Sequence, residues 1–130
     1  MILTELLKEN LYTVYGPNHN LSYFTLETVQ TIIRQVCIAV EKLHSLNVIH
    51  TDLKPENILI KSYSNKTVKV IDLGSSIFFS DPLGFSLQTV TYRAPEVFLG
   101  IPYDEKIDIW SIGCIAAEIF SGNVLFNGRN

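Results

Sequence analysis

The sequence predicts a mixed α+β fold in which helices predominate, and three segments carry that prediction. Apolar residues recur at helical spacing across residues 26–43. Two short runs with strand character, 57–61 and 67–71, flank the polar stretch SYSNK, which is typical of a hairpin. Residues 106–120 are apolar on nearly all sides, so we expect them to form a central, buried helix.

The N-terminal half can be assigned element by element. Residues 2–7, ILTELL, are apolar enough for the end of a buried strand or for a linker that lies on a core. A short helical turn and a Gly-Pro-Asn loop follow. Thr25 suits the N-cap of a helix that runs to about residue 44, where His44 would be a packed or capping histidine. The short segment NVIH then reads as a β-like run before the hairpin.

The C-terminal half begins with a long segment of no clear period. Residues 72–93 contain two glycines and a proline, and loops of this length are usually functional or disordered. Residues 94–99 suit a short helix, and Gly122 suits the end of the helix at 106–120. Within that helix we expect Trp110 to be a core anchor.

Composition excludes several classes of protein. Ten basic residues against 13 acidic ones give a net charge of −3, without the basic stripe of a nucleic-acid binder. The longest apolar stretch, 107–120, is too short to cross a membrane, and no secretory signal opens the chain. Cys37 and Cys114 lack metal-site spacing, which predicts reduced core thiols. We therefore expect neither nucleic acid nor a membrane as partner, and a cytoplasmic or nuclear location, or both.

A polar cluster opens the predicted hairpin in the stretch HTDLKPENILI. Asp52, Lys54 and Asn57 lie close together there, and Asp72 ends the second strand, so the hairpin brings it beside Asn57. An amide oxygen and a carboxylate suit Mg²⁺, and a second carboxylate can accept the proton of a hydroxyl. With a lysine to offset charge, these are the groups that phosphoryl transfer requires.

Each of these motifs alone has an ordinary explanation, since Asp and Asn are common in turns. Their order is more informative. HTDLKPEN is followed 15 residues after its Asn by DLG, then by TYRAPE and by DIWSIGC. Such an ordered set favours a catalytic interpretation over chance.

These segments resemble the C-lobe of eukaryotic protein kinases, from the hinge to the helix after the activation segment, over essentially the whole chain. Within that superfamily, ELLKENLY and LGIPYDEKIDIWSIGC are similar to the dual-specificity tyrosine-regulated kinases (DYRK), and KSYSNKTVKVIDLGSS to their plant and protist members. The HTD variant also occurs in the CDC-like kinases. The resemblance implies that residues 1–130 are a partial kinase domain, without the N-lobe and the last helices.

The resemblance also implies a role for each matching residue. Asp52 would be the catalytic base and Lys54 a contact of the γ-phosphate, while Asn57 and Asp72 would hold Mg²⁺. On the nucleotide side, Leu59 would lie under the adenine ring. The hinge, whose backbone pairs with adenine, would comprise Glu5, Leu6 and Leu7. Asp108 would hold the backbone of the catalytic loop.

The chain departs from the family pattern around the activation loop. Thr51 stands where most kinases have an arginine that pairs with a phosphate. Ser86 and Val90 replace the activating tyrosine of the DYRK family and the arginine that helps to bind its phosphate, while Arg93 remains as a possible anion partner. Phosphorylation of Ser86 or Thr89 and an active loop without phosphate stay open as alternatives.

Two functions follow from these observations. The first is an ATP- and Mg²⁺-dependent protein kinase that phosphorylates serine or threonine of protein substrates, with tyrosine open as a further acceptor. We expect these 130 residues alone to be inactive, because a glycine-rich loop, the β3 lysine and the helix-C glutamate are not among them. The alternative is a non-catalytic, kinase-like binding module or pseudokinase relic.

Overall fold

A computed structural model describes residues 6–15, 22–82, 84 and 86–128. Helices predominate and two small antiparallel sheets accompany them, which confirms the predicted mixed α+β class. The elements, in chain order, are α1 (Leu11–Tyr15), α2 (Leu26–Ser45), β1 (Val48–Ile49), the 3₁₀ turn η1 (Pro55–Asn57), β2 (Ile58–Ser62), β3 (Thr67–Val70), β4 (Ile77–Phe78), the 3₁₀ turn η2 (Val90–Tyr92), α3 (Pro95–Phe98) and α4 (Lys106–Ser121).

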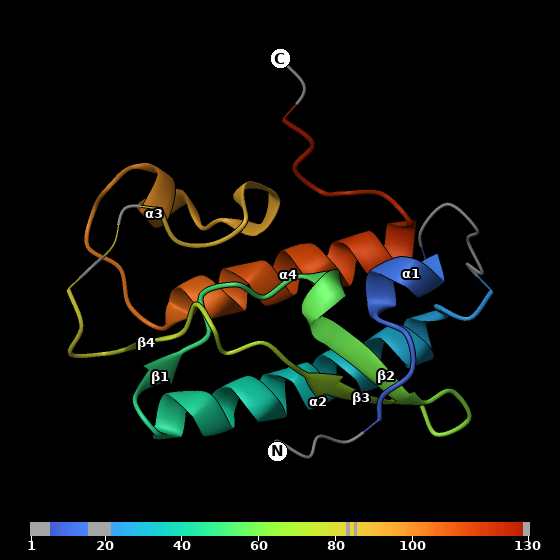
Figure 1. The fold of residues 1–130 in the computed structure, drawn as a ribbon. Coiled ribbons are helices and arrows are strands. Elements are labelled where there is room, and N and C mark those ends of the chain that lie inside the picture. The colour runs from blue at the N-terminus through green and yellow to red at the C-terminus, as the bar shows by residue number, and fades with distance from the viewer. Residues whose placement is uncertain (1–5, 16–21, 83, 85, 129–130) are drawn as a thin grey trace.

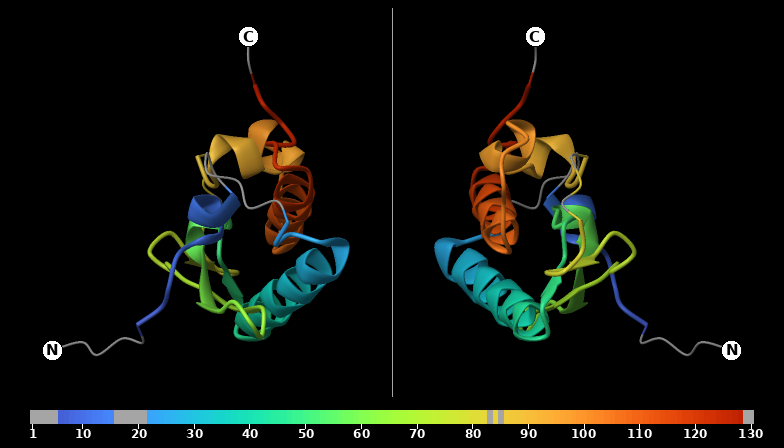
Figure 2. Two further views of the ribbon diagram at one scale, coloured as in Figure 1. Left: turned by 90° about the vertical axis from the view of Figure 1, so that its right-hand side faces the viewer. Right: turned by 90° about the vertical axis from the view of Figure 1, so that its left-hand side faces the viewer.

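The two long helices form one side of the molecule. Seen end-on, α2 and α4 lie on one side, the β2–β3 hairpin on the other, and α3 over the top (Figures 1 and 2). Helix α2 begins where predicted, because the Thr25 hydroxyl accepts a hydrogen bond from the Thr28 backbone N–H at 3.2 Å. Its buried face, which includes Ile32 and Val36, packs against α4 and β3.

The hairpin forms within about one residue of its predicted bounds. Strands β2 and β3 pair antiparallel, with Ile58 opposite Val70. The Gln35 side chain joins α2 to this hairpin, since its Nε2 donates to Lys66 O (2.8 Å) and its Oε1 accepts from Val68 N (3.1 Å). The hairpin is therefore held to the long helix as well as by its own ladder.

Residues 8–10 run along the edge of β2 that does not pair with β3. Lys8 N donates to Ile60 O at 2.9 Å, and Ile60 N donates to Glu9 O at 2.8 Å. The expectation of a buried strand end or linker at residues 2–7 falls mostly outside the described residues. Where it can be checked, burial is wrong for Leu6, whose side chain is exposed, and Leu7 is half-buried.

Helix α4 is buried on one face only, so the prediction of a helix buried all round is wrong for the described residues. Ile112 and Ile115 belong to the main apolar core, whereas Ile109 is exposed. Trp110 is partly exposed and stacks on Phe126 with ring centroids 5.6 Å apart, so it is a surface stack and not the predicted core anchor.

Two further differences concern short-range patterns. Strands β1 and β4 pair with each other, so the long loop contains an unpredicted strand; two residues are too few to show a period. Cys114 is buried as predicted, but Cys37 is exposed because it lies on the outer face of α2.

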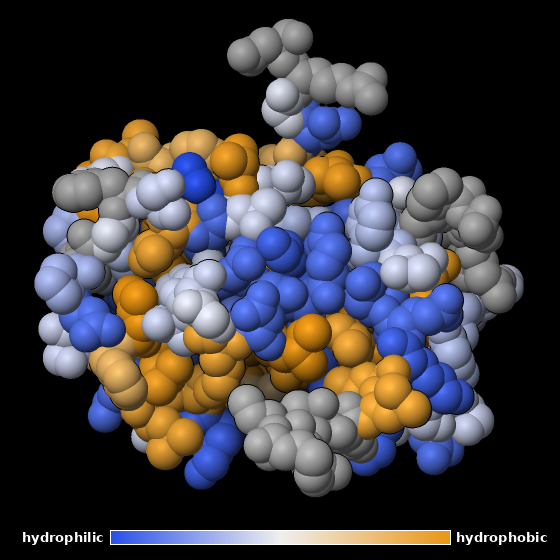
Figure 3. Space-filling view, viewed as in Figure 1, coloured by the Kyte–Doolittle hydropathy of each residue, from blue (hydrophilic) through white to orange (hydrophobic). Residues whose placement is uncertain are grey.

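The surface of the molecule has both apolar and hydrophilic areas. A space-filling view shows apolar surface over β1 and β4, beside a hydrophilic band across the centre (Figure 3). Among the helices of the described residues, none has the length and apolar character needed to cross a membrane.

Candidate functional site

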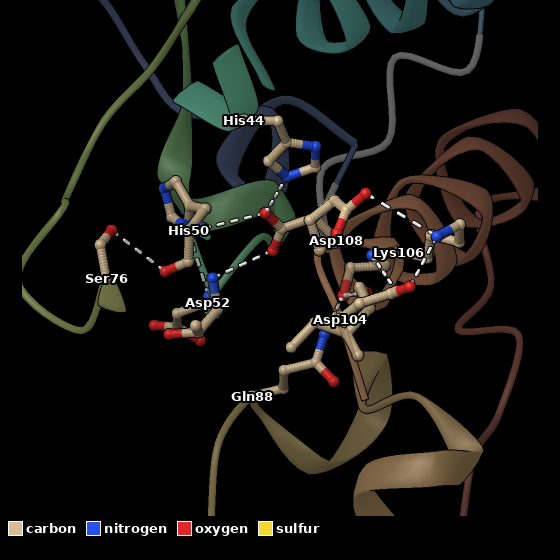
Figure 4. A network of polar contacts seen from close by, with 12 residues as sticks. His44, His50, Asp52, Ser76, Gln88, Asp104, Lys106 and Asp108 are labelled. Atoms are coloured by element: carbon tan, nitrogen blue, oxygen red, sulfur yellow. Dashed lines mark hydrogen bonds and ion pairs between the residues drawn. The ribbon is translucent and has the colours of Figure 1, made fainter. Parts of the chain in front are cut away.

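A buried aspartate on α4 holds the backbone that leads into the polar cluster. Asp108 is fully buried, and its carboxylate accepts from the backbone N–H groups of His50 (2.9 Å) and Thr51 (3.0 Å) (Figure 4). This confirms the contact that the kinase resemblance implied for Asp108. His44 Nε2 lies 2.8 Å from the same carboxylate, a partner that its position near the end of α2 did not reveal.

Thr51 joins this loop to the segment after Asp72. It is fully buried and has a left-handed backbone (φ 67°), which is unusual for a β-branched residue and costs about 1–3 kcal/mol. Its hydroxyl donates to Ser75 O at 2.7 Å, and the Ser76 hydroxyl donates to His50 O at 3.2 Å (Figure 4). These bonds offset the backbone strain and connect two loops that are distant in sequence.

The predicted residues Asp52, Lys54 and Asn57 do come together. Lys54 Nζ lies 3.1 Å from Asp52 Oδ2, and Asn57 Nδ2 donates to the Asp52 backbone oxygen at 2.9 Å. Asn57 is buried, while the side chains of Asp52 and Lys54 are about one-fifth to one-quarter exposed, at 19% and 26%. A carboxylate and an ammonium group therefore share a site that solvent can reach.

Asp72 follows directly on the hairpin and lies next to this cluster. Ile71 N donates to Asn57 O at 2.9 Å, so the backbone pairing of the hairpin brings residue 72 beside Asn57. Asp72 is exposed and has a left-handed backbone (φ 65°), and its Oδ1 accepts from Gly74 N at 3.1 Å.

The donor set of Asn57 and Asp72 fits Mg²⁺. Because the amide nitrogen of Asn57 is committed to Asp52, its oxygen is the atom left to coordinate a cation. An amide oxygen and an exposed carboxylate are hard ligands of the kind that Mg²⁺ takes, with water and phosphate completing its shell. Among the described residues, no group of three or more His, Cys, Asp or Glu side chains could hold a metal ion.

Thr89 belongs to the same cluster, although its position in the sequence did not indicate it. Its hydroxyl donates to Asp52 Oδ1 at 2.7 Å and accepts from Lys54 Nζ at 3.3 Å. The motif TYRAPE begins two residues after it, and the sequence singled out Thr89 only as a candidate for phosphorylation. Asp52 and Thr89 also line a polar cavity of about 380 Å³, together with Thr51, Ser75, Ser86, Leu87 and Gln88.

The predicted nucleotide-side residues are only partly covered by the structure. Leu59 is half-buried on β2 and forms a β-bridge with Asn10, so the segment after Leu7 does lie against it. Leu6 projects into solvent, and Glu5 lies outside the described residues.

Arg93, the predicted anion partner, is occupied by backbone groups. Its Nε donates to Leu87 O at 2.8 Å, and its Nη2 donates to Gln88 O at 2.8 Å. The guanidinium also lies over the Phe98 ring, 5.1 Å from its centroid. Ser86 and Val90 are both exposed, so neither contributes a buried contact to this loop.

A buried carboxylate further along α4 binds two tyrosines. Glu118 is almost completely buried and accepts from the hydroxyls of Tyr15 and Tyr92, the latter at 2.7 Å. Burial, followed by the hydrogen bond to Glu118, raises the pKa of both phenols well above the ordinary value of a tyrosine. Glu118 is one of two acids in the apolar sequence of α4, and the sequence did not reveal its tyrosine partners.

Comparison with known proteins places the chain in a family. The model of the protein kinase domain matches residues 1–130. Serine/threonine-protein kinase ppk5 of Schizosaccharomyces pombe is 45% identical over 99% of the chain, which covers 15% of that protein. Dual specificity tyrosine-phosphorylation-regulated kinases are also similar: kinase 4 of Homo sapiens (43% identical, 99% of the chain, 25% of that protein) and kinase 2 of Drosophila melanogaster (40%, 99% and 18%).

The similarity extends along the chain but not along its relatives. The chain spans 14–32% of the length of the first three curated relatives that it matches. Identities to yeast, fly and human proteins are comparable, so the plant and protist type stays a prediction. A family model that covers every residue, together with relatives at 40–45% identity, means that this chain belongs to the protein kinase domain family and is similar to its DYRK members.

Proposed function

We propose that residues 1–130 are the part of a protein kinase domain that carries the phosphoryl-transfer residues, from the hinge to the helix after the activation segment in the C-terminal lobe. The proposed reaction transfers the γ-phosphate of ATP to serine or threonine of a protein substrate, with tyrosine as a further acceptor, as the names of the dual-specificity relatives suggest. The observation that carries the proposal is the convergence of Asp52, Lys54 and Asn57 within hydrogen-bonding distance of one another.

Asp52 is the proposed base. Its Oδ1 accepts a hydrogen bond from the Thr89 hydroxyl at 2.7 Å, which is the separation that a general base needs from the hydroxyl it activates. The Asn57 amide holds the Asp52 backbone, so the carboxylate has a fixed orientation. Lys54 supplies a positive charge next to this carboxylate and would offset the charge on a transferring phosphoryl group.

Asn57 and Asp72 are the proposed ligands of Mg²⁺. When bound, the ion would offset negative charge on the phosphates of ATP. Leu59 would contact the adenine ring, and the backbone of the segment that includes Glu5 and Leu7 would pair with the edge of the base. The support for this side is the bridge between Asn10 and Leu59, which brings that segment against β2.

The test uses the product of the gene that contains this chain. Transfer of labelled phosphate from ATP to a generic basic protein is measured with Mg²⁺ for the wild type and for Asp52→Asn. Loss of a general base lowers kcat by about 10²–10⁴-fold, and we expect an unchanged KM for ATP. Asp104→Asn is the matched control, because that side chain is 52% exposed and forms its ion pair with Lys106 at the surface, away from Asp52.

Three results bear on the proposal. A fall in kcat for Asp52→Asn but not for Asp104→Asn supports it. Equal transfer by Asp52→Asn and the wild type contradicts the role of Asp52. A wild type that binds ATP and transfers no phosphate favours the alternative function, a kinase-like binding module.

A further inference from the structure

Two consecutive residues of the loop before η2 contact different parts of the molecule. Thr89 contacts the polar cluster, through its hydroxyl bonds to Asp52 and Lys54. The side chain of Gln88 extends instead from this loop towards α4 (Figure 4). The position of the Thr89 hydroxyl therefore depends on what holds Gln88.

The Gln88 amide is buried and fully used. Its Nε2 donates to Ile107 O and to Ser111 Oγ, both at 2.9 Å, and its Oε1 accepts from Ala94 N at 2.8 Å. The Ser111 hydroxyl in turn donates to Tyr92 O at 2.8 Å. Loss of this amide would leave the buried Ala94 N without its acceptor and would remove one donor each from Ile107 O and Ser111 Oγ, so an apolar side chain of the same size cannot replace the contact.

The backbone of Gln88 is fixed as firmly as its side chain. Its φ of 68° is left-handed, a conformation that a residue with a side chain keeps only where its surroundings impose it. The Gln88 carbonyl accepts from Arg93 Nη2 at 2.8 Å and from Arg93 Nε at 3.3 Å. Side chain and carbonyl together determine the direction in which the chain leaves towards Thr89.

The polar cavity beside this loop offers few partners for a phosphate among the residues that line it. None of the described residues that line the neighbouring polar cavity is a lysine or an arginine, and one of them is the acid Asp52. A phosphate on Ser86, which lines the same cavity, would meet that carboxylate, and the neighbouring cation, Lys54, is already paired with Asp52 and Thr89. Arg93, the nearest alternative partner in sequence, is already bonded to the Leu87 and Gln88 carbonyls.

We propose that Gln88 is a positioning residue, which holds Thr89 against Asp52 and Lys54. Its contacts keep residues 88–94 in the conformation that places the Thr89 hydroxyl on Asp52, and this conformation does not require phosphorylation of the loop. Where it concerns turnover, this inference rests on the proposed kinase function. Gln88 itself acts only through Thr89 and does not contact the reacting groups.

The kinetic test compares two glutamines that each tie elements together. Gln88→Leu removes the contact with α4, and Gln35→Leu removes the equivalent contact between α2 and β3, which involves none of the site residues. In the gene product treated with phosphatase, we expect the wild type to keep at least half of its kcat. Gln88→Leu should lose at least tenfold in kcat with KM for ATP within twofold, whereas Gln35→Leu should stay within twofold in both. Equal effects of the two variants, or a tenfold loss on phosphatase treatment of the wild type, would overturn the inference.

A second measurement does not depend on activity. Amide hydrogen exchange is followed at residues 88–94 in the same unphosphorylated proteins. We expect at least tenfold faster exchange in Gln88→Leu, with no change in Gln35→Leu, and exchange that is equal in Gln88→Leu and the wild type would overturn the inference. If Gln88→Leu does not fold, Gln88→Glu replaces it, because a carboxylate keeps the size but cannot donate to Ile107 O. If the wild type transfers no phosphate, the proposed function fails, and exchange alone decides the role of Gln88.

Discussion

Replacing Asp108 by asparagine should destabilise the protein strongly, although the two side chains have the same shape. The Asp108 carboxylate accepts from three donors, His44 Nε2, His50 N and Thr51 N, at 2.8–3.0 Å. Asparagine has one acceptor oxygen, so in either orientation its NH₂ faces at least one backbone N–H. A buried donor without a partner costs about 1–3 kcal/mol, and the remaining bonds lose about 1 kcal/mol each with the charge. We therefore expect a loss of about 3–5 kcal/mol.

Urea unfolding followed by circular dichroism measures this loss. With a slope of about 1–3 kcal/mol per molar urea, the midpoint should fall by at least about 1 M. Asp104→Asn is the control, since Asp104 pairs with Lys106 at the surface (2.6 Å) and such pairs contribute about 0–1 kcal/mol. A loss below about 1 kcal/mol for Asp108→Asn would refute the reasoning, because it would mean that the loop backbone finds other acceptors.

Three further predictions concern stability. Burial and the bond to Glu118 raise the pKa of Tyr15 and Tyr92. The folded protein therefore holds the two phenol protons more tightly than the unfolded chain, in which the pKa of tyrosine is about 10. The stability that the two protonated phenols contribute is complete below pH ~10 and decreases as the pH rises above that value, so Tm should fall in that range. Ultraviolet absorbance that shows both phenols ionising at pH ~10 in the folded state would contradict this expectation. Gly122→Ala should cost about 1–2 kcal/mol in urea unfolding, because Gly122 ends α4 with a left-handed backbone (φ 75°). Gly113→Ala, where an added Cβ meets nothing within 4 Å, should instead stabilise the helix by about 0.5–1 kcal/mol.

The elements that were predictable from sequence are those whose determinants are local. Helix α2 is indicated by its period and by Thr25, and α4 by its apolar run and by Gly122. The β1–β4 pair was not predictable in this way, because its strands are two residues long and meet only through the tertiary fold. The exposed side of α4, with Ile109 and Trp110, was missed for a related reason: apolarity alone does not say which faces a neighbour will cover.

In the candidate site, too, the features with local determinants were predictable and those that depend on the tertiary fold were not. Asp52, Lys54 and Asn57 are close in sequence, so their spacing was enough to predict a cluster. Thr89 lies 37 residues from Asp52, and its approach depends on how a loop without any period packs on α4. For Asp108, the resemblance to a known family supplied the contact that spacing alone did not. Non-local hydrogen bonds, which no short pattern encodes, account for what was missed.

The left-handed residues of this chain carry a consequence for protein engineering. Of the five non-glycine residues with positive φ among the described residues, Thr51 and Gln88 hold the loops around Asp52, and Asp72 is a proposed metal ligand. Glycine at any of these three positions would relax the main chain and would also remove the functional side chain. At Asp72, which is exposed, a library selected for heat resistance alone would therefore drift towards glycine, and thermal gain and loss of turnover would be selected together. At Thr51 and Gln88 the buried side-chain hydrogen bonds oppose that drift.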